Sequence, residues 1–485
     1  MMASSHTVAA VAVDAKKASP PSNACLARLP PEVLLRITWH LSTKDLGSMR
    51  LTCRAIERNL FHSFSHEFFR KKQFMVYSES LQALFDISKH PILSQVLKHV
   101  IIGTDRLVAP IAHGWSSRVQ ELTQNEVRRL HQALGDQMHL VSTGALKEIL
   151  VEVFSNLSNL ETVEIRDFES PSRRRDGSSA KWTSFFAKTL QEQIGRKVLL
   201  TRDPSEELDP YPSQLFTTVI AALATSNARP NSLEVGLRFC RRQWGLQDAA
   251  FFVSPRIESS ATPMLAGLKK LHLTLVFPDD YRMKPLLLQK FLLYVPNITW
   301  LRLNFVGHGR SAWTRIEEFL VWLGETSDDE QALGSSPTPD LVRFPYLEQL
   351  DFGTISVKAG ILLKLLSKFS STMRTLSLRR VGLMTESSEE WDRGVHPWAG
   401  FLKELLKVVG PRFQSLNISY PAWNLSSISS RLLVFRSADQ NLEKLEQHIL
   451  ANDHMSLEKA VQEAIDSLHL KKCMYIFSYE RESFN

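Results

Sequence analysis

Apolar residues recur along most of the chain in a short pattern: an apolar residue, two others, an apolar residue, one other and a further apolar residue. The last two apolar positions alternate as they do in a half-buried strand, so each copy predicts one short strand. Copies of the pattern occur at Leu97/Val100/Ile102, Leu160/Val163/Ile165, Leu268/Leu271/Leu273, Ile298/Leu301/Leu303, Leu347/Leu350/Phe352, Met373/Leu376/Leu378 and Phe413/Leu416/Ile418, with a degenerate copy at Leu233/Val235/Leu237.

Amphipathic helices are predicted before several of these strands, because apolar residues return there every three or four positions. The expected helices span residues 145–157, 315–324, 360–369 and 398–409. A repeated unit of helix, turn and short strand is typical of a solenoid, in which no unit buries its apolar face alone. The alternative is an α/β domain whose strands merely look alike. Both interpretations place the strands side by side with the helices outside.

The repeated unit resembles leucine-rich repeats, although the Asn or Cys that usually follows the strand is mostly absent and the spacing varies. Polar insertions explain the longer intervals, and they are expected at residues 170–180, 201–213, 326–339 and 385–397. An amphipathic helix from Leu457 to Leu468, with Ser456 as its N-cap, and a β-prone tail through Tyr479 are expected to close the array.

The segment from Leu29 to Phe69 predicts three short helices with more apolar surface than they can bury among themselves. The first begins at Pro30-Pro31, where a missing N–H is harmless, and Ser42 or Thr43 can cap the second. A module of this size usually needs a staple, a metal or a partner, and the segment has neither a disulfide pattern nor a metal motif. A partner is therefore expected.

The same segment resembles an F-box. The positions that agree with the family pattern are Leu29, Pro30, Glu32, Val33, Leu34, Ile37, Leu41, Asp45, Leu46, Arg50, Thr52, Cys53 and Arg54. The chain departs from the pattern at Ala55 and Ile56, since many members have an aromatic residue shortly after Cys-Arg. Cys53 matches the small buried residue of the family.

The resemblance implies that the N-terminal helices dock on a Skp-type linker protein, and through it on a cullin. The remaining chain would then capture a target protein for ubiquitin transfer. The docking surface is expected to consist of the apolar residues left over in the F-box, which are Leu29, Pro30, Val33, Leu34, Ile37, Leu41, Leu46 and Met49.

Target capture is expected on the strand face away from the helices, where the residues between buried positions point outward. Those residues are Glu164, Arg166, His272, Trp300, Arg302, Asn304, Asp351, Ser377, Arg379 and Asn417. Trp300 and Arg302 are favoured, because Trp and Arg are over-represented in interface hot spots. The alternative is that these are solvated strand positions without a partner.

Composition adds limits to this picture. The formal net charge of +7 is modest over 485 residues, and no basic stripe with interleaved aromatic residues suggests nucleic-acid binding. The four cysteines are too scattered for a disulfide scaffold or a zinc site, which fits a reducing compartment and a cytoplasmic or nuclear location. No apolar run approaches the roughly 20 residues that span a bilayer. A membrane role is therefore not expected.

Candidate chemistry is sparse. There is no Gly-rich phosphate loop and no Gly-x-Ser-x-Gly motif. His62 and His66 have a metal-capable spacing but lack a third ligand, and acidic runs such as Asp328-Asp329-Glu330 lie in expected insertions. Neither a cofactor, a metal nor a catalytic residue is predicted.

The expected fold class is therefore α/β, with an N-terminal three-helix F-box followed by an irregular leucine-rich-repeat-like solenoid. Its expected parts are a disordered leader at 1–24, the F-box at 25–75, the solenoid with polar insertions at 76–440, and a C-terminal helical cap and tail at 441–485. The chain resembles fungal F-box proteins, which often join a single F-box to ragged leucine-rich repeats.

As function, the resemblance implies a non-catalytic substrate-recognition adaptor of an SCF-type (Skp–cullin–F-box) E3 ubiquitin ligase, acting in ubiquitin-dependent degradation. A second hypothesis is a repeat scaffold that binds the Skp-type linker outside a ligase. A third hypothesis, an enzyme with an appended F-box, is less favoured because the chain lacks catalytic motifs.

Overall fold

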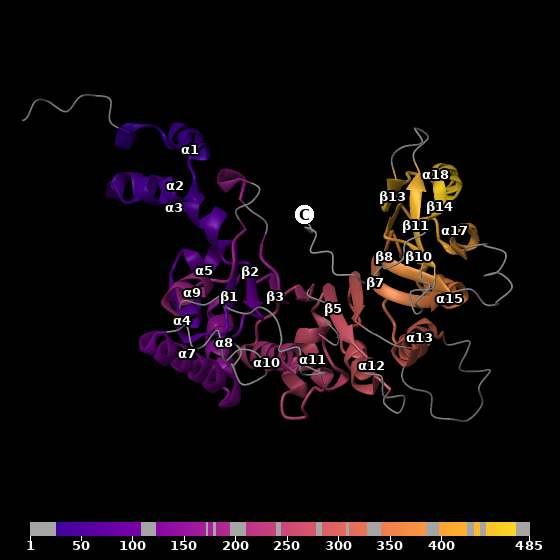
Figure 1. Ribbon diagram of the computed structural model, residues 1–485, viewed down its shortest axis with the longest axis horizontal. Coiled ribbons are helices and arrows are strands. Elements are labelled where there is room, and N and C mark those ends of the chain that lie inside the picture. Colours follow the sequence, from indigo (N-terminus) through magenta and orange to yellow (C-terminus); the bar gives the residue numbers. More distant parts are fainter. Residues whose placement is uncertain are drawn as a thin grey trace, which may run out of the picture. The chain divides into compact units, whose positions relative to one another are not determined.

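The computed structural model describes residues 26–107, 123–170, 173–177, 181–194, 210–238, 244–277, 284–306, 310–326, 341–384, 397–423, 431–436 and 443–471 (Figure 1). The expected leader and the β-prone tail after Met474 lie outside these residues. The chain divides into two compact units. The N-terminal unit comprises residues 1–67 together with 172–180, and the second unit comprises 68–171 together with 181–485.

The N-terminal unit contains the three predicted helices, α1 (Pro31–Trp39), α2 (Thr43–Arg50) and α3 (Arg54–Phe69), after a short 3-10 helix η1 (Leu26–Arg28). Pro31 lies in the first turn of α1, as expected. Ser42 is the N-cap of α2, since its hydroxyl accepts a hydrogen bond from the backbone N–H of Asp45. A second short 3-10 helix, η2 (Arg174–Asp176), belongs to this unit although it lies far along the chain.

The second unit is built on one long sheet. Its first nine strands are parallel and follow the sequence order: β1 (Lys71–Met75), β2 (His99–Gly103), β3 (Thr162–Arg166), β4 (Ser232–Gly236), β5 (Lys270–Val276), β6 (Trp300–Val306), β7 (Gln349–Lys358), β8 (Thr375–Met384) and β9 (Ser415–Ser419). Sequential parallel pairing requires a crossover between every two strands, and helices supply most of these crossovers. The mixed α/β arrangement is solenoid-like, as predicted.

Two apolar rows explain the stacking of the strands. The residues of every predicted triplet are buried, and their strand positions lie opposite one another in the register. For example, Leu271 pairs with Leu301 and Leu301 with Leu350. Because these side chains share one face of the sheet, each strand buries its neighbour's apolar residues as well as its own.

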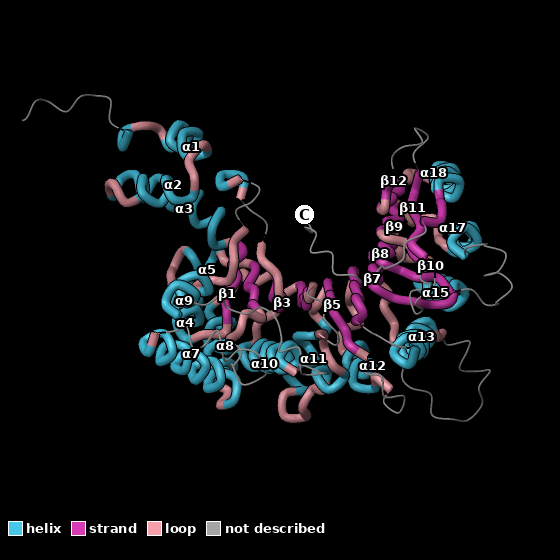
Figure 2. The backbone as a smooth tube through the Cα atoms, viewed as in Figure 1, coloured by secondary structure: helices cyan, strands magenta, loops and turns pink. Residues whose placement is uncertain are grey.

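The helices of the second unit lie along the apolar face of the sheet (Figure 2). They are α4 (Ser78–Lys89), α5 (Leu93–Val96), α7 (Gln124–Ser142), α8 (Ala145–Asn156), α9 (Ala187–Ile194), α10 (Tyr211–Ser226), α11 (Glu258–Ala266), α12 (Leu286–Leu293), α13 (Arg310–Gly324), α15 (Ala359–Phe369) and α17 (Pro397–Val408), with a 3-10 helix η3 (Asp248–Phe251). The four helices expected from periodicity correspond to α8, α13, α15 and α17 within a few residues. The expected insertions reach too far at two ends, since Tyr211 begins α10 and Pro397 begins α17.

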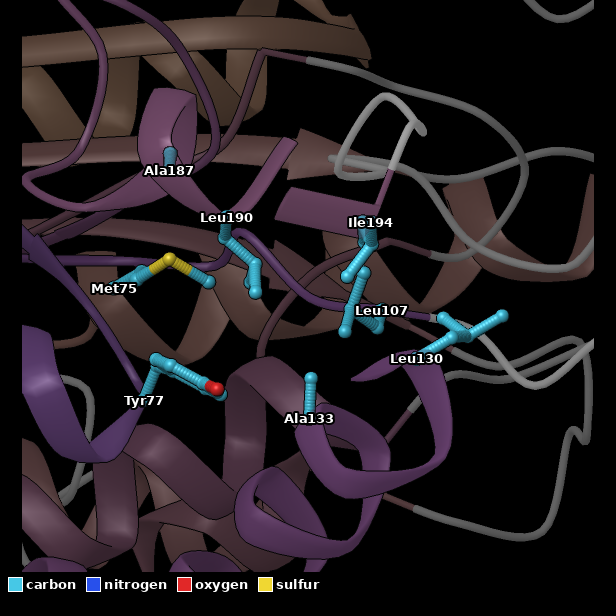
Figure 3. Packing of buried hydrophobic residues seen from close by; sticks show 8 residues of the cluster. All are labelled: Met75, Tyr77, Leu107, Leu130, Ala133, Ala187, Leu190 and Ile194. Carbon is cyan, nitrogen blue, oxygen red and sulfur yellow. The ribbon is translucent and has the colours of Figure 1, made fainter. Parts of the chain in front are cut away.

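Several elements were missed at the start of the sheet. The first is β1, which pairs with β2 directly after α3, where charged residues obscured its pattern. Two others are α7 and α9, which pack on each other and share a buried cluster with Met75 at the end of β1. Figure 3 shows this packing through Met75, Tyr77, Leu107, Leu130, Ala133, Ala187, Leu190 and Ile194, which form one buried cluster.

The C-terminal part of the sheet changes direction. Antiparallel strands follow: β13 (Glu446–Leu450) covers the edge of β9, and β11 (Arg431–Arg436) pairs with β10 (Ala422–Trp423), β12 (Glu443–Lys444) and β14 (Leu468–Lys471). The last helix, α18 (His454–Ser467), begins earlier than expected. Its N-cap is Asp453, and Ser456 is the reciprocal member of the capping box rather than the cap itself.

Candidate partner-binding surfaces

The exposed apolar surface of the N-terminal unit is centred on α1. Val33 and Ile37 lie one turn apart and are 41% and 37% exposed. Of the other residues expected on this surface, Pro30 is exposed, and Leu29, Leu41 and Met49 are half-buried. These six residues are at least partly accessible, and their contact with a partner stays a prediction.

Leu34 and Leu46 do not lie on this surface. They are only 0% and 4% exposed, because each occupies the inward side of its short helix and fills the interior of the three-helix unit. The expectation that all eight residues are left over for a partner is wrong for these two. A three-helix unit must use some of its apolar residues for its own core, and periodicity alone does not separate those from the rest.

Four further exposed apolar residues of the N-terminal unit were not predicted. Leu35 and Trp39 lie one turn apart on the other side of the buried Leu34, and Trp39 is 62% exposed. Leu26 and Leu51 are also exposed. Exposed apolar side chains therefore flank the buried side of α1 on both sides. Single exposed apolar residues are common on protein surfaces, but a group of this kind is not.

The polar face of the sheet lies opposite the helices. Residues at matched register positions form a central row that runs from β1 to β9 through Gln73, Ile101, Glu164, Glu234, His272, Arg302, Asp351, Ser377 and Asn417. Trp300 lies two residues before this row, and Arg166, Asn304 and Arg379 lie two residues after it. The strands thus bring all ten expected residues to one face.

Four of these ten residues are buried, contrary to expectation: Glu164, Arg166, His272 and Asp351. Neighbouring side chains cover them. A carboxylate oxygen of Glu164 lies 2.9 Å from Nε2 of His99 and 3.2 Å from Nζ of Lys71. Burial would raise the pKa of Glu164, but the close approach of His99 and the charges of Arg166 and Lys71 lower it. These four side chains therefore hold the strands of the polar face together and expose little surface to a partner.

Arg166, the last residue of β3, is held by side chains of β1 and of the segment directly after β3. Its guanidinium donates two hydrogen bonds to Oε1 of Gln73, at 2.7 and 3.0 Å, and a further one to Ser170. Its Cζ lies 5.0 Å from the ring centre of Phe168. An arginine that is fully engaged by its own chain is a poor candidate for direct target contact.

Trp300 and Arg302 form a partly accessible group on the polar face, and both donate to the same carboxylate. Asp351 accepts hydrogen bonds from the indole Nε1 of Trp300 at 3.0 Å and from Nε and Nη2 of Arg302 at 2.9 and 2.7 Å. His272 meets the Trp300 ring edge-on at 4.5 Å between ring centres. The Arg302 side chain is nevertheless 41% exposed, and Trp300 is half-buried. The buried carboxylate therefore fixes two partly accessible side chains.

A buried polar cluster at the end of β2 was missed by the sequence reasoning. Asp105 is only 3% exposed and accepts a hydrogen bond from the hydroxyl of Ser184. Burial raises the pKa of the Asp105 carboxyl, although the bonds from Ser184 and Gln73 oppose the shift. Phe185 donates its N–H to the carbonyl of Gln73 at 2.8 Å. These contacts hold residues 182–186 against β1, and no sequence periodicity marks them.

Comparison with known protein families decides the nature of the N-terminal unit. Residues 26–69 match the F-box-like family model. These residues form an F-box-like domain. The match covers the three helices and ends where α3 ends, and no curated protein matches the chain. F-box proteins are generally non-catalytic adaptors, and the domain supports binding of a Skp-type linker in SCF-type complexes.

Two smaller expectations for the F-box have different outcomes. Cys53 is exposed, so its expected burial is wrong; it immediately precedes the first residue of α3, Arg54, and lies outside the packed face of that helix. His62 and His66 lie with ring centres 4.5 Å apart. Within the described parts of the chain, no group of three or more His, Cys, Asp or Glu residues is placed to hold a metal ion. The helices in those parts also include none that is long and apolar enough to cross a membrane.

Proposed function

We propose that this protein is the substrate-recognition subunit of an SCF-type E3 ubiquitin ligase, with a cytoplasmic or nuclear location. The F-box would bind the Skp-type linker and, through it, a cullin, while the second unit would bind the target protein. The ligation chemistry would then belong to a conjugating enzyme on the complex. The contribution of this chain would be effective concentration, because a tethered target meets the charged conjugating enzyme almost intramolecularly.

The match of residues 26–69 to the F-box-like family carries this proposal. The accessible Val33 and Ile37 on α1 support it, since an exposed apolar group of this kind marks an interaction site. Leu34 is unsuitable for testing the surface, because its buried side chain belongs to the core of the F-box.

The linker-binding surface is tested with the double variant Val33→Asp, Ile37→Asp in the full chain. Loss of apolar burial and the placing of charge in an apolar contact should weaken binding of a purified Skp-type linker by about 100-fold or more. Affinity is measured by isothermal titration calorimetry. Arg36→Asp is the matched control, because it places the same charge on the solvent-facing side of α1 and should change affinity little.

Equal affinity of the double variant and the wild type would refute this docking surface. Absence of any binding by the wild type would refute the adaptor function itself.

Target binding is proposed to use the Trp300–Arg302 pair on the polar face. Pre-organised Trp and Arg side chains are typical of hot spots, and Asp351 holds both in place before any partner arrives. The test restores wild type or Trp300→Ala to cells that lack the protein and measures protein half-lives across the proteome. Proteins that the wild type destabilises should be spared by Trp300→Ala but not by Lys403→Ala, which changes an exposed residue of α17.

The second candidate function is a scaffold that binds the linker outside a ligase. Both candidate functions use the same F-box surface to bind the linker. They differ in outcome, because only the ligase adaptor leads to ubiquitin-dependent degradation of a target protein. If no protein turns over faster in the presence of the wild type while linker binding is intact, the scaffold is the correct function and the ligase adaptor is not.

A further inference from the structure

The F-box unit contains a segment from more than 100 residues further along the chain. Residues 173–177 lie in the expected insertion after β3, yet they belong to the N-terminal unit. We call residues 173–177 the clasp. Residues 170–180 are expected from the sequence to be a polar insertion, but two side chains of the clasp contact the F-box helices directly.

Arg175 of the clasp contacts the end of α1. Its Nη1 donates hydrogen bonds to the carbonyl oxygens of Thr38 and Leu41, at 2.8 and 2.9 Å. The same guanidinium pairs with both carboxylate oxygens of Glu67 on α3, at 2.6 and 2.5 Å. Only 8% of the Arg175 side chain is exposed, so solvent screens this bidentate pair much less than a surface pair.

Asp176 of the clasp contacts the start of α2. Its carboxylate accepts hydrogen bonds from the backbone N–H and the hydroxyl of Thr43, at 2.8 and 2.5 Å. Thr43 is the first residue of α2, and Ser42 satisfies the N–H of Asp45. Two of the otherwise unpaired N–H groups at this helix start therefore have acceptors, one of them supplied by the clasp.

The charges of the two clasp residues match the helix ends that they meet. A guanidinium lies against carbonyls at the C-terminal end of α1, and a carboxylate lies at the N-terminal end of α2. Each arrangement is the favourable one for the helix dipole. Neighbouring residues of opposite charge thus bind both sides of the turn between α1 and α2.

We propose that the clasp is a part of the F-box domain that positions α1 and α2 for partner binding, and that Arg175 and Asp176 are positioning residues for this purpose. Residues 26–69 alone would lack the groups that close the α1–α2 turn. Val33 and Ile37 on α1 and Met49 on α2 lie on the two helices that this turn joins. Only the effect on linker affinity rests on the proposed function; the effect on the F-box does not.

The first test measures hydrogen exchange by mass spectrometry in the full chain, on peptides from Thr38 to Arg50. Loss of an N-terminal cap or its equivalent should make exchange there about five- to tenfold faster in Asp176→Ala, and similarly in Arg175→Ala. Asp176→Asn, which keeps an acceptor for the Thr43 N–H, should restore most of the protection. Glu169→Ala and Lys181→Ala are matched controls, since they change exposed charges beside the clasp.

The second test separates Arg175 from general loss of structure. In a double-mutant cycle, Glu67→Ala should add little to the effect of Arg175→Ala on exchange, because both remove the same ion pair. Additive effects would show that the pair does not couple the clasp to α3. Wild-type exchange in both Arg175→Ala and Asp176→Ala would overturn the proposal.

The third test measures affinity for a purified Skp-type linker. Both alanine variants should bind about three- to tenfold more weakly, since a smaller fraction of the chain holds α1 and α2 in the binding arrangement. Faster exchange with unchanged affinity would overturn the positioning role. If the wild type itself fails to bind the linker, the proposed function fails, while the exchange experiments still decide whether the clasp completes the domain.

Discussion

Glu234 shows how one residue of the polar face couples stability to pH. Its carboxylate accepts a hydrogen bond from the hydroxyl of Ser232 at 2.8 Å and lies 3.6 Å from Nδ1 of His272. Burial raises the pKa of Glu234, but the interactions with His272 and Ser232 outweigh it and bring the pKa to about 2. The ionised form is therefore favoured by folding.

A carboxyl whose pKa falls on folding stabilises the protein above its unfolded pKa and loses this contribution as the pH falls. For Glu234 the loss occurs between pH 4.5 and about 2. We expect Glu234→Gln to lower the free energy of unfolding by at most about 3 kcal/mol at pH 6, and by clearly less at pH 3. Urea unfolding at both pH values measures this.

The partner of Glu234 provides the control for this prediction. In a His272→Asn background the Glu234→Gln change should cost much less at pH 6, because the main favourable interaction is already absent. A cost that is the same at pH 6 and pH 3 would contradict the assignment of the pKa shift.

At the scale of the element, β7 and β8 share an unusual irregularity. Thr354 and Arg380 have positive φ angles of 55° and 53°, and the register skips both residues, passing from Gly353–Arg379 to Ile355–Val381. Tyr420, directly after β9, has a φ of 54°. Neighbouring strands thus bend at the same level, in the manner of aligned β-bulges. None of the three residues is glycine, so no residue type in the sequence marks this bend.

The strain at this bend predicts a stabilising substitution. A β-branched residue in the left-handed region costs roughly 1–2 kcal/mol, which exceeds the entropy cost of glycine in a strand, about 0.5–1 kcal/mol. Thr354→Gly should therefore raise the free energy of unfolding by about 0.5–1 kcal/mol. The measurement is differential scanning calorimetry or urea unfolding.

Thr375 offers a matched control. It is also a half-buried threonine, at the start of the neighbouring strand β8, and its φ is not positive. Thr375→Gly should destabilise the protein by about 1 kcal/mol. Destabilisation by both substitutions would show that Thr354 is not strained.

For the whole molecule, the sequence predicted those features that rest on repeated apolar positions. The strands must bury apolar residues such as Leu271, Leu301 and Leu350 in any fold. A solenoid does so by stacking the repeated units, so that each unit covers the apolar residue of the next. The F-box was predicted for a different reason: its residues follow a family pattern in a fixed order. Both patterns involve residues that are close together in the chain, so they can be recognised from the sequence alone.

The remaining features depend on contacts that are distant in sequence. β1 follows α3 directly, and its residues were expected inside the F-box at 25–75 rather than in a strand of the sheet. Leu34 and Val33 are equally apolar neighbours on α1, but only packing against the other helices decides which is buried. The accessible Trp300 was predicted correctly as a polar-face residue, whereas its support by Asp351 required the register of two neighbouring strands.

The order of synthesis gives the clasp a further consequence. Thr43 and Asp176 are 133 residues apart, so the ribosome completes α1, α2 and α3 long before Asp176 exists. At about 5–20 residues per second, this interval lasts roughly 7–27 s. During that time the nascent chain already displays the apolar residues of α1 while the turn between α1 and α2 has no clasp. Full affinity for the linker would then arise only after β2, β3 and the clasp have been synthesised, and a truncated nascent chain would compete poorly with the finished protein for the same partner.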